Sequence, residues 1–396
     1  MPIPNRFAEL QAEITGWRHD LHAHPELLFD THRTSALVAE RLRAFGCDEV
    51  VEGIGRTGVV GVIRGRSTAS GRVIALRADM DALPITEETG LPHASLTPGR
   101  MHACGHDGHT AMLLGAARYM AETRRFDGTV VLVFQPAEEG GGGGREMVED
   151  GLMDRFGVQE VYGMHNQPGL PVGHFALRAG PIMASSDNFE IHVTGKGGHA
   201  ARPQDCIDAT VVASQIVLSL QTVVSRNVDP LKRVVLTIGI FESDSRSGAV
   251  IAQKVRLRGT VRTLDPEYRA IAEERVHRIV EGTALALGAR AEVVWLPGYP
   301  VTVNSAAQAR HAAETARAVA GVGCVEDDCE PMLAAEDFAY MLQERPGAFL
   351  FIGNGDSAQL HHPAYEFDDT ALPYGAAWHA GIAEARMPLG VESAAV

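Results

Sequence analysis

Hydrophobic positions in the first part of the chain follow a helical period and then a strand pattern. From Phe7 to about Gly46 apolar residues recur every three or four positions, with a break at residues 22–25 where a proline stands. This spacing predicts two helices, because apolar residues at such intervals share one helix face. Short apolar runs bounded by polar residues or glycine then predict strands at 59–63, 73–76, 129–134 and 161–164.

The pattern changes between about Ile182 and Leu296. Apolar alternation and helical spacing there predict strand, helix, strand, strand, helix and strand at 189–194, 209–225, 234–241, 255–263, 267–287 and 291–296. This β-α-β-β-α-β order is the ferredoxin-like split unit, and its length suits an inserted domain. From Asn304 onward helix and strand alternate again. The fold class we expect is therefore α/β, with a discontinuous domain of residues 1–181 and 298–396 and an insert of residues 182–297.

Polar residues follow the strands predicted for the discontinuous domain. Asp81 comes shortly after one strand, residues 135–139 end a second, and His165 ends a third. A strand predicted at 349–352 leads to His361 and His362. In open α/β sheets, sites lie beyond the carboxyl ends of the strands, so we expect these side chains to converge on one crevice.

The stretch from Arg100 to Thr110 holds three histidines, a cysteine and an aspartate in eleven residues. In an extended backbone His102, Cys104 and His106 would project to one face. A thiolate and an imidazole two residues apart suit zinc or another borderline divalent metal, and a thiolate can bridge two ions. The alternative is a histidine-rich loop at the start of a helix, with Thr110 as its cap.

Together these residues offer the parts of a two-metal hydrolase. Cys104 would bridge, and the remaining ligands would be His106, Glu139, His165 and one of His361 or His362. Of Glu138 and Glu139, one would ligate while the other takes a proton from water. Asp81 would either hold a ligating imidazole in place or cap a helix.

Composition narrows the class of protein. The formal net charge of −15 argues against a nucleic-acid partner, since binding to a phosphate backbone needs a basic face. Five scattered cysteines fit free thiols in a reducing compartment. The first twenty residues lack an apolar signal core, and no run of eighteen apolar residues occurs. We expect a cytoplasmic protein without a membrane span.

Several motifs occur in the order of one known family. They are LHAHPEL from Leu21, RADMDALPI from Arg77, MHACGHDGHTAMLLGAA from Met101, QPAEEGGGGGREM from Gln135, MHNQPGLPVG from Met164, GKGGHAARPQDCIDA from Gly195, GTVRT from Gly259, AEDFAYML from Ala335 and LHHPAYEFDD from Leu360. Across essentially its whole length the chain resembles the hippurate hydrolase and auxin-conjugate amidohydrolase family. That family is the amidohydrolase branch of the aminoacylase-type zinc metallopeptidases.

The resemblance implies roles for particular residues. It implies a di-metal exopeptidase-like catalytic domain with Glu138 as general base, and metal ligands Cys104, His106, Glu139, His165 and His361. Two divalent ions per subunit follow, Zn²⁺ or Mn²⁺, with Co²⁺ or Ni²⁺ as alternatives. The inserted domain would form a homodimer, and His199 would reach the partner's active site to stabilise the oxyanion. Asn227 and Arg262 match positions near the bound substrate. From the residues alone, His199 would instead cap the helix that follows Asp208.

The expected reaction is cleavage of an N-acyl amino acid by metal-activated water. One segment, Ser247–Ala252, departs from the Asn-Val-Ile-Pro turn usual in the family, so contacts of the insert and the choice of substrate are open there. Other readings are a dipeptidase or N-acetyl-diaminoacid deacetylase on the same scaffold, or a silent relative that binds metal or ligand without turnover. Thiol-protease chemistry at Cys104 is disfavoured, because a metal-bound thiolate is not a free nucleophile.

Overall fold

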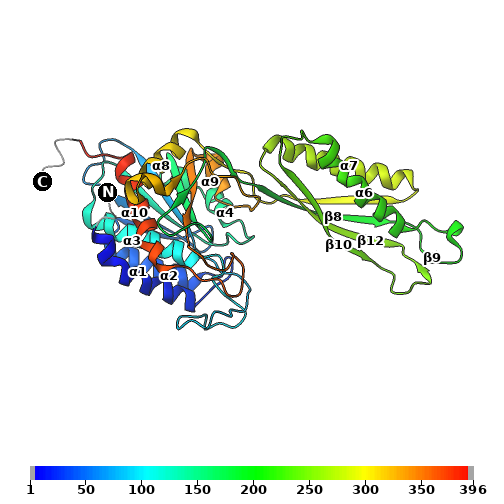
Figure 1. Ribbon diagram of the computed structural model, residues 1–396, viewed down its shortest axis with the longest axis horizontal. Coiled ribbons are helices and arrows are strands. Elements are labelled where there is room, and N and C mark those ends of the chain that lie inside the picture. Colours follow the sequence, from blue (N-terminus) through cyan, green and yellow to red (C-terminus); the bar gives the residue numbers. More distant parts are fainter. Residues whose placement is uncertain (1–4, 391–396) are drawn as a thin grey trace. The chain divides into compact units, whose positions relative to one another are not determined.

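The computed structural model describes residues 5–390, which form two compact units (Figure 1). The larger unit contains the chain up to Ile182, then Val303–Glu330, and then the chain from Asp337 onward. The smaller unit contains Met183–Thr302 and Pro331–Glu336. The sequence placed the boundaries at residues 182 and 297. It did not anticipate that the short segment 331–336 lies with the smaller unit.

The larger unit is built on an eight-stranded mixed sheet in the order β1-β2-β4-β3-β5-β16-β6-β15. Its strands are β1 (Glu49–Ile54), β2 (Gly58–Arg64), β3 (Val73–Asp79), β4 (Thr129–Gln135), β5 (Glu160–Gln167), β6 (Phe175–Ala176), β15 (Val325–Glu326) and β16 (Gly347–Gly353). Strands β4, β3, β5 and β16 are neighbours and run parallel. Their apolar runs are buried, as expected for parallel strands covered on both faces.

The four parallel strands bring their carboxyl ends to one edge of the sheet. In register, Asp79 at the end of β3 lies opposite Gln135 at the end of β4. His165 on β5 lies opposite Phe351 on β16. The sequence prediction that polar residues after these strands converge is therefore confirmed for the strand ends themselves.

Helices pack around this sheet. Those of the larger unit are α1 (Asn5–Ala23), α2 (His32–Phe45), α3 (His106–Thr123), α4 (Gly143–Glu149), α5 (Leu152–Arg155), α8 (Ala306–Ala320), α9 (Ala339–Glu344) and α10 (Leu372–Arg386). Helix α3 lies against β2, β3, β4 and β5, and its apolar side chains are buried almost throughout. Helices α1 and α10 pack on α3, and α8 packs on α10. This layer fixes α3, whose first turn starts at the sheet edge described above.

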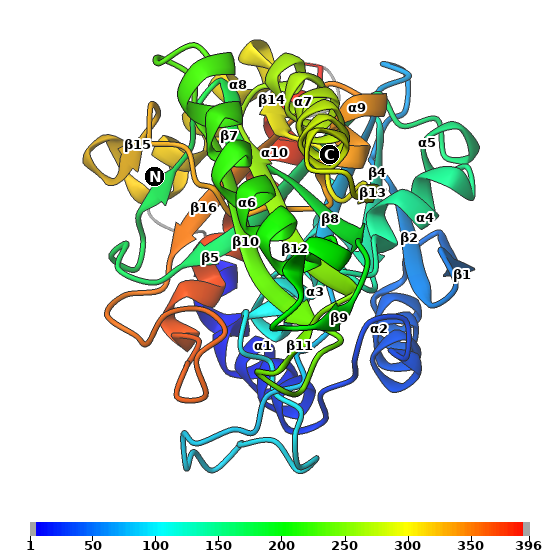
Figure 2. The same ribbon diagram turned by 90° about the vertical axis from the view of Figure 1, so that its right-hand side faces the viewer.

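The smaller unit is a four-stranded antiparallel sheet with two helices. Its strands are β8 (Ser185–Thr194), β10 (Val234–Ser243), β12 (Lys254–Thr263) and β13 (Arg290–Leu296), in the order β10-β12-β8-β13. Helices α6 (Ala209–Asn227) and α7 (Pro266–Ala286) pack side by side, as Figure 2 shows. Burial alternates along β8, which is typical of a sheet with one face on a core. The predicted ferredoxin-like order is confirmed.

The remaining elements are short. They are β7 (Gly180–Met183), β9 (Gly198–His199), β11 (Val250–Ile251), β14 (Thr302–Asn304), and the 3-10 turns Pro203–Asp205, Val322–Cys324 and Asp369–Ala371. Of the helices within residues 5–390, none is both long and apolar enough to cross a membrane.

Candidate metal centre

The segment around Cys104 enters helix α3 through a glycine. Gly105 has a φ of 88°, and a Cβ there would collide with Oδ1 of Asn166 and the hydroxyl of Tyr365. Only glycine fits this left-handed and crowded position. His106 is the first residue of α3. The prediction that His102, Cys104 and His106 alternate along an extended strand is therefore wrong for His106, and the cap is Gly105 instead of Thr110.

Glu138 and Glu139 lie in a tight turn after β4. Ala137 before them has a φ of 56°, and the carboxylate of Asp81 accepts the backbone N–H of Glu138 (2.9 Å) and of Glu139 (3.1 Å). The carbonyl oxygen of Asp81 also accepts a hydrogen bond from Nδ1 of His106 at 2.9 Å. Asp81 thus holds the imidazole through its main-chain carbonyl, whereas the prediction gave that role to its carboxylate. Its carboxylate binds the backbone of the Glu138–Glu139 turn. The alternative prediction was that this carboxylate caps a helix.

Five predicted ligands come together at this edge of the sheet. Sγ of Cys104 lies 3.3 Å from Nε2 of His165, and Nε2 of His361 lies 3.3 Å from Oε1 of Glu139. Ligand atoms of Cys104, His106 and His165 lie within 4.8 Å of one another, as do those of Cys104, Glu139 and His361. Cys104 is common to both groups. Such an arrangement can place one ion in each group with the sulfur between them.

His361, and not its neighbour His362, faces this cluster. Its backbone N–H donates to the carbonyl of Ala103 at 2.7 Å, and its φ of 65° turns the side chain toward Glu139. His362 is exposed, and its Nδ1 accepts the N–H of Ala364. The structure therefore separates two adjacent histidines that the residues alone left as alternatives.

Two buried atoms in the cluster have no hydrogen-bond partner within the described part of the chain. They are Nε2 of His106 and Oε1 of Glu139. A buried polar atom without a partner costs roughly 1–3 kcal/mol. Because Nδ1 of His106 is already held by Asp81, its Nε2 is the nitrogen that remains for an ion. The donor set of sulfur, imidazole nitrogen and carboxylate oxygen fits a borderline divalent cation.

The charges of the cluster also favour a cation. Burial, together with the carboxylates of Glu139 and Glu138, raises the pKa of the Cys104 thiol well above its usual range. Burial would lower the pKa of His106, yet the carboxylates of Asp79 and Asp81 raise it to about 10. The site is therefore rich in negative charge. A bound cation would supply the missing positive charge and allow the thiol to ionise.

A second layer of buried contacts, which sequence reasoning missed, supports the ligands. Nδ1 of His109 lies 2.6 Å from Oδ1 of Asp79, and Nε2 of His109 lies 2.8 Å from Oδ1 of Asn166. His109 stands one helical turn after His106, so the two imidazoles share one side of α3. The i, i+3 spacing of these histidines was the signal available in the sequence.

A charged network lies beneath the general-base candidate. Arg77 donates to Asp79 (2.7 Å), to Gln135 (2.9 Å) and to Asp337 (3.0 Å), and all four side chains are fully buried. The backbone N–H of Asp337 in turn donates to Oε1 of Glu138 at 3.4 Å. Arginine in the middle of a buried apolar strand was the sequence signal for this network, because a charge is buried only with partners.

His102 does not join the cluster. Its ring is buried, and neither nitrogen has a hydrogen-bond partner among the described residues. Burial lowers its pKa to about 4, so this imidazole is neutral at pH 7. Its position two residues before Cys104 had suggested a shared face.

His22 is a buried charged histidine whose titration should affect stability. Its Nδ1 lies 2.9 Å from Asp107 and its Nε2 lies 3.3 Å from Glu87. Burial would lower the pKa of His22, but these two carboxylates raise it to about 9. A histidine with a raised pKa stabilises the fold fully below its unfolded value of about 6.5, and this contribution is lost as pH rises through about 9.

We therefore expect the thermal midpoint to fall between pH 6.5 and 9, with a loss of up to roughly 3 kcal/mol in unfolding free energy. His22→Gln should flatten this dependence. His32, whose side chain is 75% exposed, provides the control, and His32→Gln should leave the profile unchanged. Equal profiles for the wild type and His22→Gln would contradict the prediction.

His199 lies in the smaller unit on an exposed hairpin. It pairs with Val250 of β11, and its Nδ1 accepts the N–H of Ala201 at 3.1 Å. The carboxylate of Asp208 itself caps α6, so the prediction that His199 caps this helix is wrong. The unusual segment Ser247–Ala252 contains β11. It is therefore the direct strand partner of His199.

The two residues predicted to bind substrate, Asn227 and Arg262, also belong to the smaller unit. Asn227 ends α6, and its side-chain amide donates to the carbonyl of Thr222 at 2.7 Å. Arg262 lies on β12 opposite Ser186, and burial lowers the pKa of its guanidinium although Asp187 opposes this. Neither contact tests a role in binding substrate.

The chain is similar to proteins of known class over almost its full length. Residues 75–385 match peptidase family M20/M25/M40. The chain is 41% identical to a hippurate hydrolase of Campylobacter jejuni, covering 95% of this chain and 97% of that protein. It is 42% identical to an N-acetyl-L-cysteine deacetylase of Bacillus subtilis, covering 93% and 87%. A Bacillus subtilis crystal structure described as a dinuclear metal binding peptidase of the M20 family superimposes with a TM-score of 0.83 at 37% identity, covering 95% and 98%.

Proposed function

The chain belongs to peptidase family M20/M25/M40, and we propose that the cluster around Cys104 is the centre at which it hydrolyses N-acyl amino acids. The protein is a metal-dependent amidohydrolase with a small-molecule substrate, in agreement with the resemblance seen in the sequence. One observation carries the proposal. Two groups of ligand atoms share the sulfur of Cys104, with the carboxylate of Glu138 close to His106 and Glu139.

The protein binds divalent metal ions, and we propose two per subunit. Their ligands would be Cys104, His106, Glu139, His165 and His361. Zinc or manganese suits this mixed donor set, with cobalt and nickel as alternatives. Bound divalent ions lower the pKa of water and polarise a carbonyl oxygen.

Glu138 is the residue that moves the proton in this proposal. Its side chain is 7% exposed, and Asp81 and Asp337 fix its backbone and its carboxylate. It accepts a proton from the attacking water and delivers it to the departing amine nitrogen. The amide C–N bond breaks, the water oxygen stays on the acyl carbon, and a carboxylate and a free amino acid are released. A protein that only binds a ligand would need no such base.

The metal content provides a first test. We expect about two ions per subunit after saturating reconstitution, because five ligands with a shared sulfur exceed the four of an ordinary closed zinc site. Elemental analysis of the active protein measures this. Full activity with a single ion per subunit would contradict the bridged pair.

Substrate choice is tested with a panel of N-acyl amino acids on protein reconstituted with each of the four metals. Benzoyl, acetyl and indoleacetyl amides of several amino acids would cover the acyl group. Dipeptides and N-acetyl-diaminoacids test the two alternative activities, dipeptidase and N-acetyl-diaminoacid deacetylase. Turnover of the N-acyl amino acids above both other groups is the expected result. No turnover of any amide by fully metal-loaded protein would favour the silent relative.

For the smaller unit we propose the role of a lid and dimerisation domain, spanning about residues 182–297. Its edge strands β10 and β13 expose backbone groups that need a partner. The exposed side of α6 offers Val211 and Leu218, 59% and 65% exposed, on a helix without a charged residue before Arg226. Such a surface fits an isologous contact in a homodimer.

A further inference from the structure

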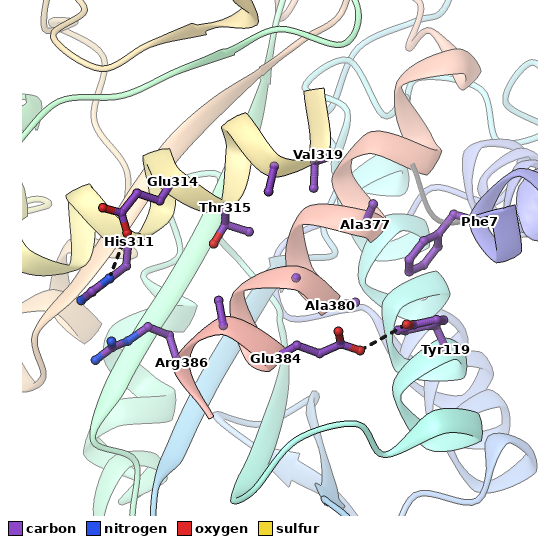
Figure 3. A pocket seen from close by; sticks show the side chains of 13 residues that line it. Phe7, Tyr119, His311, Glu314, Thr315, Val319, Ala377, Ala380, Glu384 and Arg386 are labelled. Atoms are coloured by element: carbon purple, nitrogen blue, oxygen red, sulfur yellow. Dashed lines mark hydrogen bonds and ion pairs between the residues drawn. The ribbon is translucent and has the colours of Figure 1, made fainter. Parts of the chain in front are cut away.

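A groove on the helical side of the larger unit has no part in the function proposed above. It lies over α10 between α8, α1 and α3, with a volume of about 530 Å³ (Figure 3). This volume is in the range of small-molecule sites. We call it the α10 groove. Its lining includes Phe7, Tyr119, Thr315, Ala380, Glu384 and Arg386.

The α10 groove is remote from the metal centre. Tyr119 stands near the end of α3, about 20 Å along the helix axis from His106 in its first turn. Arg386 at the end of α10 binds Glu160, the first residue of β5, whereas His165 lies near the other end of that strand. The groove thus lies toward the amino ends of the parallel strands.

One polar atom in the groove lacks a partner. Thr315 is 5% exposed, and its Oγ1 makes no hydrogen bond to any described residue. A threonine on a helix commonly bonds the carbonyl one turn before it, which this hydroxyl does not do. Figure 3 shows the oxygen on the side of α8 that faces α10. This oxygen is itself buried, so a ligand in the groove would not reach it.

The charged side chains that line the α10 groove indicate whether it would bind a cationic or an anionic ligand. Arg386 already has a carboxylate partner, because it binds Glu160 through two hydrogen bonds. Nδ1 of His311 likewise lies 3.6 Å from a carboxylate oxygen of Glu314. At the other end, Oε1 of Glu384 accepts a hydrogen bond from the hydroxyl of Tyr119 at 3.2 Å.

Glu384 is therefore the under-compensated charge of this groove. Burial raises the pKa of Glu384. This effect is larger than the lowering of its pKa by Arg125 and by the hydrogen bond from Tyr119. Beside it the rings of Phe7 and Tyr119 are in contact, with centroids 4.9 Å apart. Both rings are buried, with Phe7 0% and Tyr119 7% exposed, so they form the apolar wall behind the carboxylate. A carboxylate at the end of an apolar groove favours an amphipathic organic cation, which forms an ion pair with it and buries its apolar body.

We propose that the α10 groove is a binding site for an amphipathic amine. The ammonium group forms an ion pair with Glu384, next to the hydroxyl of Tyr119. The apolar body lies along the small side chains of α10, Ala377, Ala380 and Gly381. The site does not depend on the hydrolytic function proposed above.

The test is direct binding to the metal-loaded protein by calorimetry. The probes are 2-phenylethylamine and its N,N,N-trimethyl derivative, which has no lone pair for a metal, with 3-phenylpropionate as the charge-reversed match. We expect saturable binding of both cations and none of the acid. Equal binding of the acid, or no saturable binding of either cation, would overturn the proposal.

Two variants locate the site. Glu384→Gln keeps the shape and the acceptor for Tyr119 but removes the charge, and should weaken Kd by about tenfold or more, since hydrogen bonds to charged groups contribute about 1.5–3 kcal/mol. Ala385→Phe fills the groove from an exposed position and should abolish binding. Both should hydrolyse substrate like the wild type, which reports intact folding. Unchanged binding in both variants would place the cation elsewhere and refute the site.

Discussion

Glu138→Gln should lower kcat by about 10²–10⁴-fold while the metal content stays at the wild-type value. Glutamine has nearly the shape of glutamate and can still accept the N–H of Asp337 through its side-chain oxygen, so the turn should keep its geometry. It cannot take a proton from water. Because Glu138 is held by protein contacts on both sides, we expect loss of turnover without loss of structure.

Glu139→Gln is the matched comparison, since the two residues are adjacent in one turn. Oε1 of Glu139 lies 3.3 Å from His361 and 4.0 Å from Nε2 of His106, where a ligand to a cation would lie. This variant should lose metal first, and excess metal should restore part of its activity. Elemental analysis and kcat measured at rising metal concentration separate the two roles. If Glu138→Gln lost metal and Glu139→Gln kept it, our assignment of base and ligand would be reversed.

His199→Ala should lower kcat by about 10²–10³-fold, the cost of one lost donor to an oxyanion. The prediction rests on the family resemblance and on the position of His199 in an exposed hairpin of the smaller unit, where a side chain is available to another subunit. Metal content should remain normal. His192→Ala is the control, because His192 lies in the same unit with a side chain 46% exposed and has no proposed role.

Subunit mixing tests whether His199 acts across a dimer. A hybrid of His199→Ala and Glu138→Gln subunits contains one site with both residues intact if His199 acts on the partner. An equal mixture should then recover about a quarter of wild-type activity once subunits have exchanged at random. Exchange is verified with differently tagged subunits. If exchange is complete and activity does not return, His199 acts within its own subunit or has no catalytic role.

The altered segment Ser247–Ala252 is relevant to the same experiment. Its strand β11 pairs with β9, so it sets the backbone that carries His199. The sequence of this segment differs from the one usual in the family. In the structure the segment pairs with the strand that contains His199. A change of sequence in a direct strand partner can shift a side chain without altering the metal ligands.

The sequence by itself determined much of the fold. Buried parallel strands appear as continuous apolar runs, and burial alternates along the strands of the insert. The sequence therefore predicted β2, the four parallel strands and the four strands of the insert in their chain order, but not β1, β6 or β15. Polar residues after consecutive strands predicted one crevice, because parallel strands end at the same edge. The apolar patterns are local features of the sequence, and the common edge follows from the parallel order of the strands. They need no knowledge of distances.

The tertiary structure alone decided which residues act on one another. Arg77 and Asp337 are far apart in the chain but are joined by a fully buried contact, and only packing brings their charges together. Likewise, α3 begins at His106 because Gly105 before it has a positive φ. The positive φ of His361 directs this histidine, and not His362, toward the metal ligands. Such outcomes depend on close approach between distant segments. Periodicity along the chain carries no information about that approach, because each pattern specifies a face and not the partner that covers it.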